Sequence, residues 1–87
     1  MHEASLMTGL LSQIKAIAKK EGAKKVTGVK VWCGALSHMT KAHFTEHFEL
    51  AAKGTLAEHA ILDVTISDDP ADNRAQDVVL ESIDVAD

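Results

Sequence analysis

Residues 40–54 read TKAHFTEHFELAAKG, and this stretch decides the fold because it predicts a helix between two strands. Thr40 suits the N-cap, where a side-chain oxygen accepts a hydrogen bond from a backbone N–H of the first turn. Gly54 is the residue at which we expect the helix to end. Between these two residues, apolar side chains recur at three- and four-residue steps: Phe44, Phe48, Ala51 and Ala52. We therefore expect both phenylalanines in the core.

A strand is predicted on each side of this helix. In residues 24–33, small apolar side chains alternate with polar or bulky neighbours: Val29, Val31 and Cys33. Val26 lies out of phase with them across Gly28, which indicates a β-bulge. In residues 60–66, apolar side chains alternate with a more polar set: Ala60, Leu62, Val64 and Ile66. Because a crossover through a helix is right-handed and joins parallel strands, we expect these two strands to be parallel.

The ends of the chain add one helix and one strand. Residues 3–21 carry apolar side chains at helical spacing: Leu6, Met7, Leu10, Leu11, Ile14, Ile17 and Ala18. Gly22 follows at a position where many helices end. Asp, Asn and Pro in residues 67–74 predict a loop that returns the chain as an antiparallel strand. On that last strand, three apolar side chains share one side with Glu81: Val79, Ile83 and Val85.

The predicted element order is therefore α-β-α-β-β. We expect an α/β (α+β) fold in which two helices pack on one face of a small mixed three-stranded sheet. The 87 residues, 1–87, form a single domain in this interpretation, long enough to bury a core without disulfides. No internal repeat and no low-complexity segment interrupts the chain.

Composition limits the classes of function. Cys33 is the single cysteine, which excludes an intramolecular disulfide and a zinc ribbon of paired CxxC motifs and favours a reducing cytoplasm. The formal net charge of −4 argues against nucleic-acid binding. No apolar run approaches the roughly 20 residues that span a bilayer, so no membrane association is expected. Because neither a nucleophile with a base nor paired carboxylates can be recognised, the sequence does not predict an enzyme.

The first three residues, Met1, His2 and Glu3, are the strongest candidate site. Because His2 is bulky, we expect Met1 to be retained with a free amine. This amine, the His2 amide nitrogen and His2 Nδ1 would close a five-membered and a six-membered chelate ring on one ion. Such a planar set of nitrogens suits Ni(II) or Cu(II) better than Zn(II). In the alternative interpretation, Glu3 merely suits the start of a helix and His2 is an ordinary terminal residue.

A wider pattern favours the metal site. The chain begins Met-His-Glu, has Gly-Ala-Leu-Ser at 34–37, and reaches Ile-Asp-Val at 83–85 after a helix that contains phenylalanine. In these features it resembles the HypA/HybF family, the accessory proteins that deliver nickel to hydrogenase. The resemblance implies a nickel metallochaperone that holds Ni(II) transiently at Met1, His2 and Glu3. It also implies two partners, a nickel-handling GTPase and the NiFe hydrogenase large subunit.

The chain departs from this family in one respect. Family members usually carry a zinc-binding domain with two CxxC pairs between the second and third strands, where this chain has only the loop 67–74. We therefore expect the zinc domain to be absent and no structural zinc to be bound. The rival hypothesis is a protein interaction or regulatory module that kept the fold and no longer needs metal.

Other side chains are weaker candidates. His38 and His59 lie near the ends of predicted elements and could serve as additional metal ligands at the N-terminal site. His43 and His47 stand four residues apart on the second helix, a spacing that can chelate a metal but that exposed helix histidines also show. Trp32 faces away from the buried valines and is a candidate for a partner surface.

Overall fold

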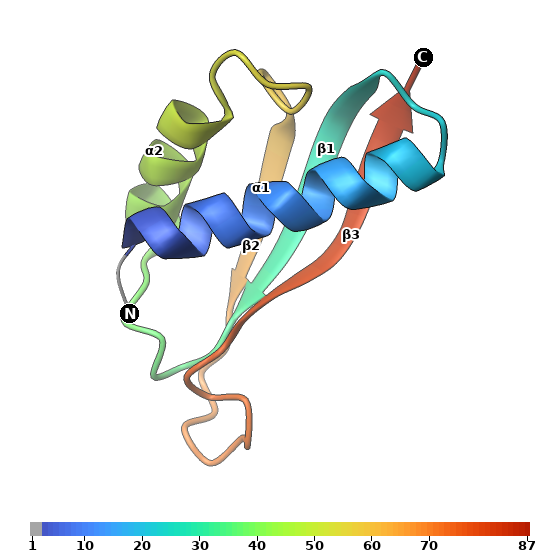
Figure 1. Cartoon of the computed structure of the whole chain (residues 1–87). Coiled ribbons are helices and arrows are strands. Elements are labelled where there is room, and N and C mark those ends of the chain that lie inside the picture. Colours follow the sequence, from blue (N-terminus) through green and yellow to red (C-terminus); the bar gives the residue numbers. More distant parts are fainter. Residues whose placement is uncertain (1–2) are drawn as a thin grey trace.

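The computed structural model describes residues 3–87, with side chains from residue 5 onward. Its elements are α1 (Glu3–Lys20), β1 (Lys25–Cys33), α2 (Lys41–Ala52), β2 (Ile61–Ile66) and β3 (Val78–Ala86). Both helices lie on the same face of the sheet, with α1 crossing the strands and α2 beside it (Figure 1). The predicted order α-β-α-β-β and the predicted fold class are confirmed.

β1 is the central strand of the sheet, whose order is β2-β1-β3. It pairs with β2 in parallel, with Val29 opposite Leu62 and Val31 opposite Val64. It pairs with β3 in antiparallel orientation. The connection through α2 is long enough to carry the chain back to a parallel strand, whereas the shorter connection after β2 allows the antiparallel return. The mixed sheet is therefore as predicted.

Two β-bulges decide which side chains of the sheet face the helices. On β1, Val26 lies opposite Val85 and Gly28 opposite Asp84, so Thr27 is the extra residue of the predicted bulge. The bulge allows Val26 and Val29, which are three positions apart, to be buried on the same side. The out-of-phase position of Val26 in the sequence thus has a direct structural cause.

A second bulge, at Glu81, makes the alternation of side chains along β3 differ from the prediction. Lys30 pairs with Ser82 and Val31 pairs with Leu80, so Glu81 is an extra residue on β3. The β3 side chains that pack against the core are consequently Val78, Leu80 and Ile83. Val79 instead lies opposite Trp32, on the face away from the helices. The prediction that Val79 shares a side with Ile83 is wrong, because one added residue reverses the alternation of a strand.

The core lies between the sheet and the two helices. Its largest fully buried side chains come from α1, β1 and α2: Ile14, Val29, Val31, Cys33, Phe44 and Phe48. α1 ends as predicted, with Gly22 at a φ of 69° and the N–H of Ala23 donating to the Ala18 carbonyl at 3.0 Å. Thr40 caps α2 as predicted, since its hydroxyl accepts from the backbone N–H of His43 at 3.1 Å.

The link between β1 and α2 packs against the connection between β2 and β3. The N–H of Leu36 donates to the Ala75 carbonyl at 2.7 Å, and the N–H of Gly34 donates to the Asp77 carbonyl at 2.8 Å. Ser37 Oγ closes the turn by donating to the Gly34 carbonyl at 2.7 Å. A Cβ on Gly34 would collide with the backbone carbonyl of Ala75. The Gly-Ala-Leu-Ser segment therefore has a structural role, in which glycine permits close approach and serine fixes the turn.

Candidate metal site

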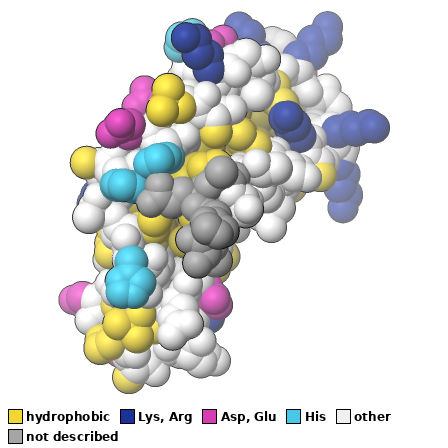
Figure 2. All heavy atoms as spheres, turned by 60° about the vertical axis from the view of Figure 1, so that its left-hand side comes forward, with side chains coloured by type: hydrophobic (Ala, Val, Ile, Leu, Met, Phe, Trp, Pro, Cys, Tyr) yellow, Lys and Arg dark blue, Asp and Glu magenta, His cyan; other side chains and the backbone are white. Residues whose placement is uncertain are grey.

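The predicted metal ligands are the first three residues of the sequence. Met1 and His2 lie outside the described residues, and Glu3 is described only by its backbone, as the first residue of α1. Backbone N–H groups in the first turn of a helix have no partner within the helix, so they are available to a ligand. Histidine and hydrophobic side chains gather on the side of the molecule formed by α2 and the start of α1 (Figure 2).

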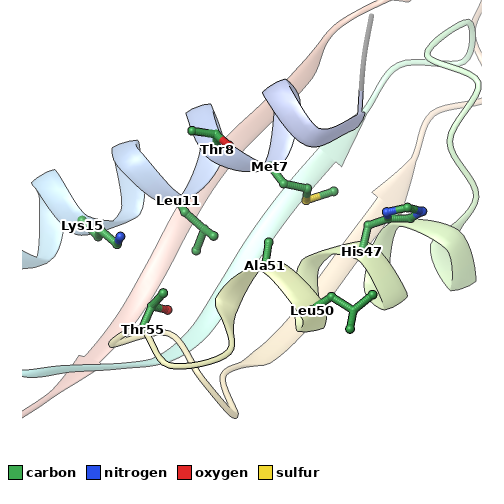
Figure 3. Close-up of a pocket in the computed structure, with 8 residues that line it drawn as sticks. All are labelled: Met7, Thr8, Leu11, Lys15, His47, Leu50, Ala51 and Thr55. Atoms are coloured by element: carbon green, nitrogen blue, oxygen red, sulfur yellow. The ribbon is translucent and has the colours of Figure 1, made fainter.

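A groove of about 630 Å³ separates α1 from α2. Its lining residues belong to the two helices and the turn that follows α2: Met7, Thr8, Leu11, Lys15, His47, Leu50, Ala51 and Thr55. Met7 and His47 lie at one end of the groove, and Lys15 and Thr55 lie at the other (Figure 3). The imidazole of His47 therefore stands at the end of the groove nearest the start of α1.

A second hollow, of about 470 Å³, lies beside the first turn of α1. Leu6 of α1 lines it together with His38 and Met39 from the link before α2 and Val78 from β3. His38 has a φ of 62°, a left-handed conformation that is uncommon for residues other than glycine. The fold thus brings His38 into the same hollow as a residue of the first turn of α1.

His59 takes a different position. It lines a hollow with Phe48, Ala52 and Lys53, at the C-terminal end of α2 and the segment that follows. His38 instead shares a hollow with Leu6 in the first turn of α1, and His47 shares the groove with Met7 and Thr8 in the second turn. Of the two additional ligands suggested by the sequence, His38 is the one that shares a hollow with the first turn of α1.

His43 and His47 stack on each other along α2. Their ring centroids are 4.5 Å apart, and the ring planes make an angle of 28°. Phe44 and Phe48, the residues that follow each histidine, are fully buried, so the same two turns present imidazoles on one side and phenyl rings to the core. Among the residues with described side chains, no group of three or more His, Cys, Asp or Glu could hold a metal ion.

Trp32 and Cys33 lie on opposite faces of β1. Cys33 is buried in the core, and this burial raises the pKa of its thiol. Trp32 is half-buried on the other face, where the guanidinium carbon of Arg74 lies 4.5 Å from the ring centroid. No sequence pattern pointed to this cation–π pair, because the two residues come from segments that only the folded chain brings together.

Comparison with known protein families shows which family the chain belongs to. A family model described as hydrogenase/urease nickel incorporation, metallochaperone, hypA, matches residues 1–74. The chain therefore belongs to the HypA family, whose members are metallochaperones and not enzymes.

Individual relatives agree with this family. The hydrogenase maturation factor HypA of Lawsonia intracellularis is 39% identical over 64 residues, which are 74% of this chain and 54% of the relative. The protein of the same name from Klebsiella pneumoniae is 43% identical over 58 residues, which are 67% of this chain and 51% of the relative. The chain thus spans about half the length of the curated relatives that it matches.

The fold itself also has a solved counterpart. The solution structure of the Ni metallochaperone HypA from Helicobacter pylori gives a TM-score of 0.81 at 24% identity, covering 98% of this chain and 97% of that one. This similarity shows that the two chains share a fold. Within residues 3–87, no helix is both long and apolar enough to cross a membrane.

Proposed function

We propose that the chain is a nickel metallochaperone that binds Ni(II) at its N-terminus and delivers it during the maturation of NiFe hydrogenase. The observation that carries this proposal is the family match, which begins at residue 1 and so includes the Met-His-Glu sequence. The family description names both hydrogenase and urease. The relatives from Lawsonia and Klebsiella are hydrogenase maturation factors, and they favour hydrogenase as the recipient.

The ligands in this proposal are the Met1 amine, the amide nitrogen and Nδ1 of His2, and Glu3. The positive end of the α1 dipole favours a neutral imidazole at His2 and a carboxylate at Glu3, both of which suit a divalent cation. His38 is our candidate for an additional ligand, since it lines the hollow beside Leu6 in the first turn of α1. Planar nitrogen ligation of this kind favours Ni(II) or Cu(II) over Zn(II).

Delivery would proceed by ligand exchange and would involve no covalent chemistry. In such an exchange, a recipient's ligands replace those of the carrier one at a time. The partners proposed on family grounds are a nickel-handling GTPase and the large subunit of NiFe hydrogenase, in the cytoplasm.

We propose further that residues 1–87 act as a single domain without a structural zinc. β2 and β3 are joined by residues 67–77, which contain no cysteine. Zinc-binding domains of the kind built from paired CxxC motifs need four thiolates or imidazoles on one ion. The one cysteine of the chain, Cys33, is buried in the core.

Calorimetric titration of the untagged protein with Ni(II), Cu(II) and Zn(II) tests the proposed function. We expect tight binding of nickel, loss of that binding in His2→Ala, and weaker binding in Glu3→Ala. His38→Asn should also weaken binding, while asparagine tolerates the positive φ of this position. If the untagged protein binds no nickel, the chain is an interaction module and the proposal fails.

A further inference from the structure

The groove between α1 and α2 has an apolar floor that reaches the surface of the protein. Leu11 extends from α1 and Ala51 from α2 toward the space between the helices (Figure 3). Leu11 is buried and Ala51 is half-buried, whereas Leu50, which lines the same groove, is 67% exposed. Apolar surface that is both concave and exposed is typical of a site that a partner covers.

Positive charge is concentrated at one end of this groove. Residues 15–25 hold five of the nine lysines and arginines of the chain but only one of its thirteen acidic residues. Lys and Arg side chains gather at one end of the molecule (Figure 2). Lys15 itself lines the groove, at the end where Thr55 lies (Figure 3). Because the whole chain has a net charge of −4, this end is opposite in sign to the rest of the protein.

The stability of α1 does not account for these charges. Lys15 and Lys19 are both exposed and lie four positions apart on the helix, so their like charges repel. Neither forms a salt bridge with the side chains that the structure describes. The helix dipole favours Lys19 in the last turn, but its effect falls off within that turn and does not extend to Lys15. Negative charge on a partner would relieve this repulsion and orient the partner on the groove.

We propose that the α1–α2 groove docks an acidic amphipathic helix of a partner protein. Apolar side chains on one face of that helix pack on Leu11, Ala51 and Leu50, and carboxylates beside them face Lys15 and Lys19. The groove is lined by two helices and a turn, which offer no strand for an extended segment to pair with, so a helix that satisfies its own backbone hydrogen bonds fits better. A long polyanion such as a nucleic acid fits less well, because the acidic remainder of the chain repels it.

A helix docked in this groove lies beside the proposed metal site. Met7, in the second turn of α1, lines the end of the groove opposite Lys15 (Figure 3). A partner that binds along the groove therefore reaches toward the start of α1. This role in metal delivery rests on the proposed nickel function, whereas docking of the helix does not.

The test uses a synthetic acidic helix as the probe. The peptide has about 15 residues, because shorter isolated helices are marginally stable, with leucines at helical spacing on one face and glutamates beside them. It is titrated at low ionic strength into isotope-labelled full-length protein, and amide shifts are followed by NMR. We expect shift changes at Leu11, Lys15 and Leu50, and binding that weakens as salt is added. The same peptide with lysine in place of glutamate should not bind.

Matched lysine pairs separate a local contact from an effect of net charge. Replacing both Lys15→Gln and Lys19→Gln should weaken binding by about fivefold, the combined effect of two exposed ion pairs. Replacing both Lys41→Gln and Lys53→Gln removes the same charge outside the groove and should leave binding nearly unchanged. Leu50→Gln should weaken binding by roughly tenfold, because it removes apolar surface that the peptide buries, while the Tm of the free protein stays the same.

Several outcomes would overturn the inference. One is the absence of shift changes in the groove, and another is an equal loss of binding from the two lysine pairs. Groove shifts that depend on protein concentration without peptide would make a second copy of the chain the occupant, and tighter binding of a single-stranded oligonucleotide would make it a nucleic acid. Because these titrations contain no metal, each of these results leaves the nickel proposal standing. Failure of the untagged protein to bind nickel would remove that proposal and leave the docking inference intact.

Discussion

At Gly34 the backbone leaves no space for a side chain. A Cβ added there would collide with the main chain at Arg74 and Ala75, and backbone atoms cannot move aside as a flexible side chain can. We predict that Gly34→Ala lowers the free energy of unfolding by roughly 3 kcal/mol, the upper end of the range for overpacked sites. Urea denaturation monitored by the fluorescence of Trp32 provides the measurement.

Gly9 is the matched control for this substitution. It lies within α1, and a Cβ added there meets nothing within 4 Å. Gly9→Ala should therefore stabilise the protein by about 0.5–1 kcal/mol, the difference in helix propensity between the two residues. Destabilisation of both variants to a similar extent would mean that the close contact at Gly34 is not the cause.

We expect Cys33 to make the free energy of unfolding decrease as the pH rises in the alkaline range. The unfolded chain loses the thiol proton near pH 8.5, whereas burial raises the pKa of this thiol in the folded state. Above that pH the unfolded state binds fewer protons than the folded state, so stability falls as the pH rises. We predict a loss of up to about 1 kcal/mol between pH 7 and 9.5.

The control for this prediction is Cys33→Ala, which should lack the alkaline decline even though its stability at pH 7 is lower. The chain has no tyrosine, so no phenol titrates in the same range. Urea midpoints at the two pH values give the comparison. A parallel decline in the parent and in Cys33→Ala would show that another group is responsible.

At the scale of elements, α2 has two faces with different roles. Phe44 is fully buried, whereas Leu50 of the same helix is 67% exposed. Phe44→Ala should cost about 3–5 kcal/mol, the range for a large core side chain. Leu50→Ala should change stability by less than about 0.5 kcal/mol. Chemical denaturation of both variants measures these losses in the free energy of unfolding. Similar losses for the two variants would contradict the assignment of the two faces.

The sequence predicted most elements because their periodicity and their end signals agree. In α2, the spacing of the phenylalanines and the cap at Thr40 point to the same helix, and the structure has it at Lys41–Ala52. The alternation of side chains along β3 was harder to predict. In the sequence Glu81 falls in phase with the apolar residues, so nothing there indicates a bulge. Pairing with Lys30 and Val31 on β1 reveals the extra residue, and pairing between strands distant in sequence is not encoded in local periodicity.

The surroundings of the candidate site were predictable only in part. The sequence suggests Met1, His2 and Glu3 as ligands, because chelate-ring size depends only on residues adjacent in the chain, and this assignment stays a prediction. It could not distinguish His38 from His59, since both lie near element ends. The folded structure shows that His38, and not His59, shares a hollow with Leu6 in the first turn of α1. The stacking of His43 on His47 likewise required coordinates, because helical spacing alone does not fix two side-chain orientations.

At the scale of the whole molecule, we predict that the purified protein carries no stoichiometric structural zinc. A closed zinc site needs four ligands, and the one cysteine of this chain is buried in the core. Elemental analysis of protein purified without chelators gives the answer. One zinc per chain, together with unfolding when it is chelated, would contradict this prediction and point to a histidine cluster.

The central claim is that the Met1 amine itself binds nickel, and blocking it is the most direct test. We would titrate Ni(II) into untagged protein and into protein acetylated or extended at its N-terminus. The account predicts a tight site with a yellow square-planar absorption band in the untagged protein only, with apo-stability changed by no more than about 1 kcal/mol. If the blocked protein binds nickel as tightly and with the same absorption band, the N-terminal site is wrong.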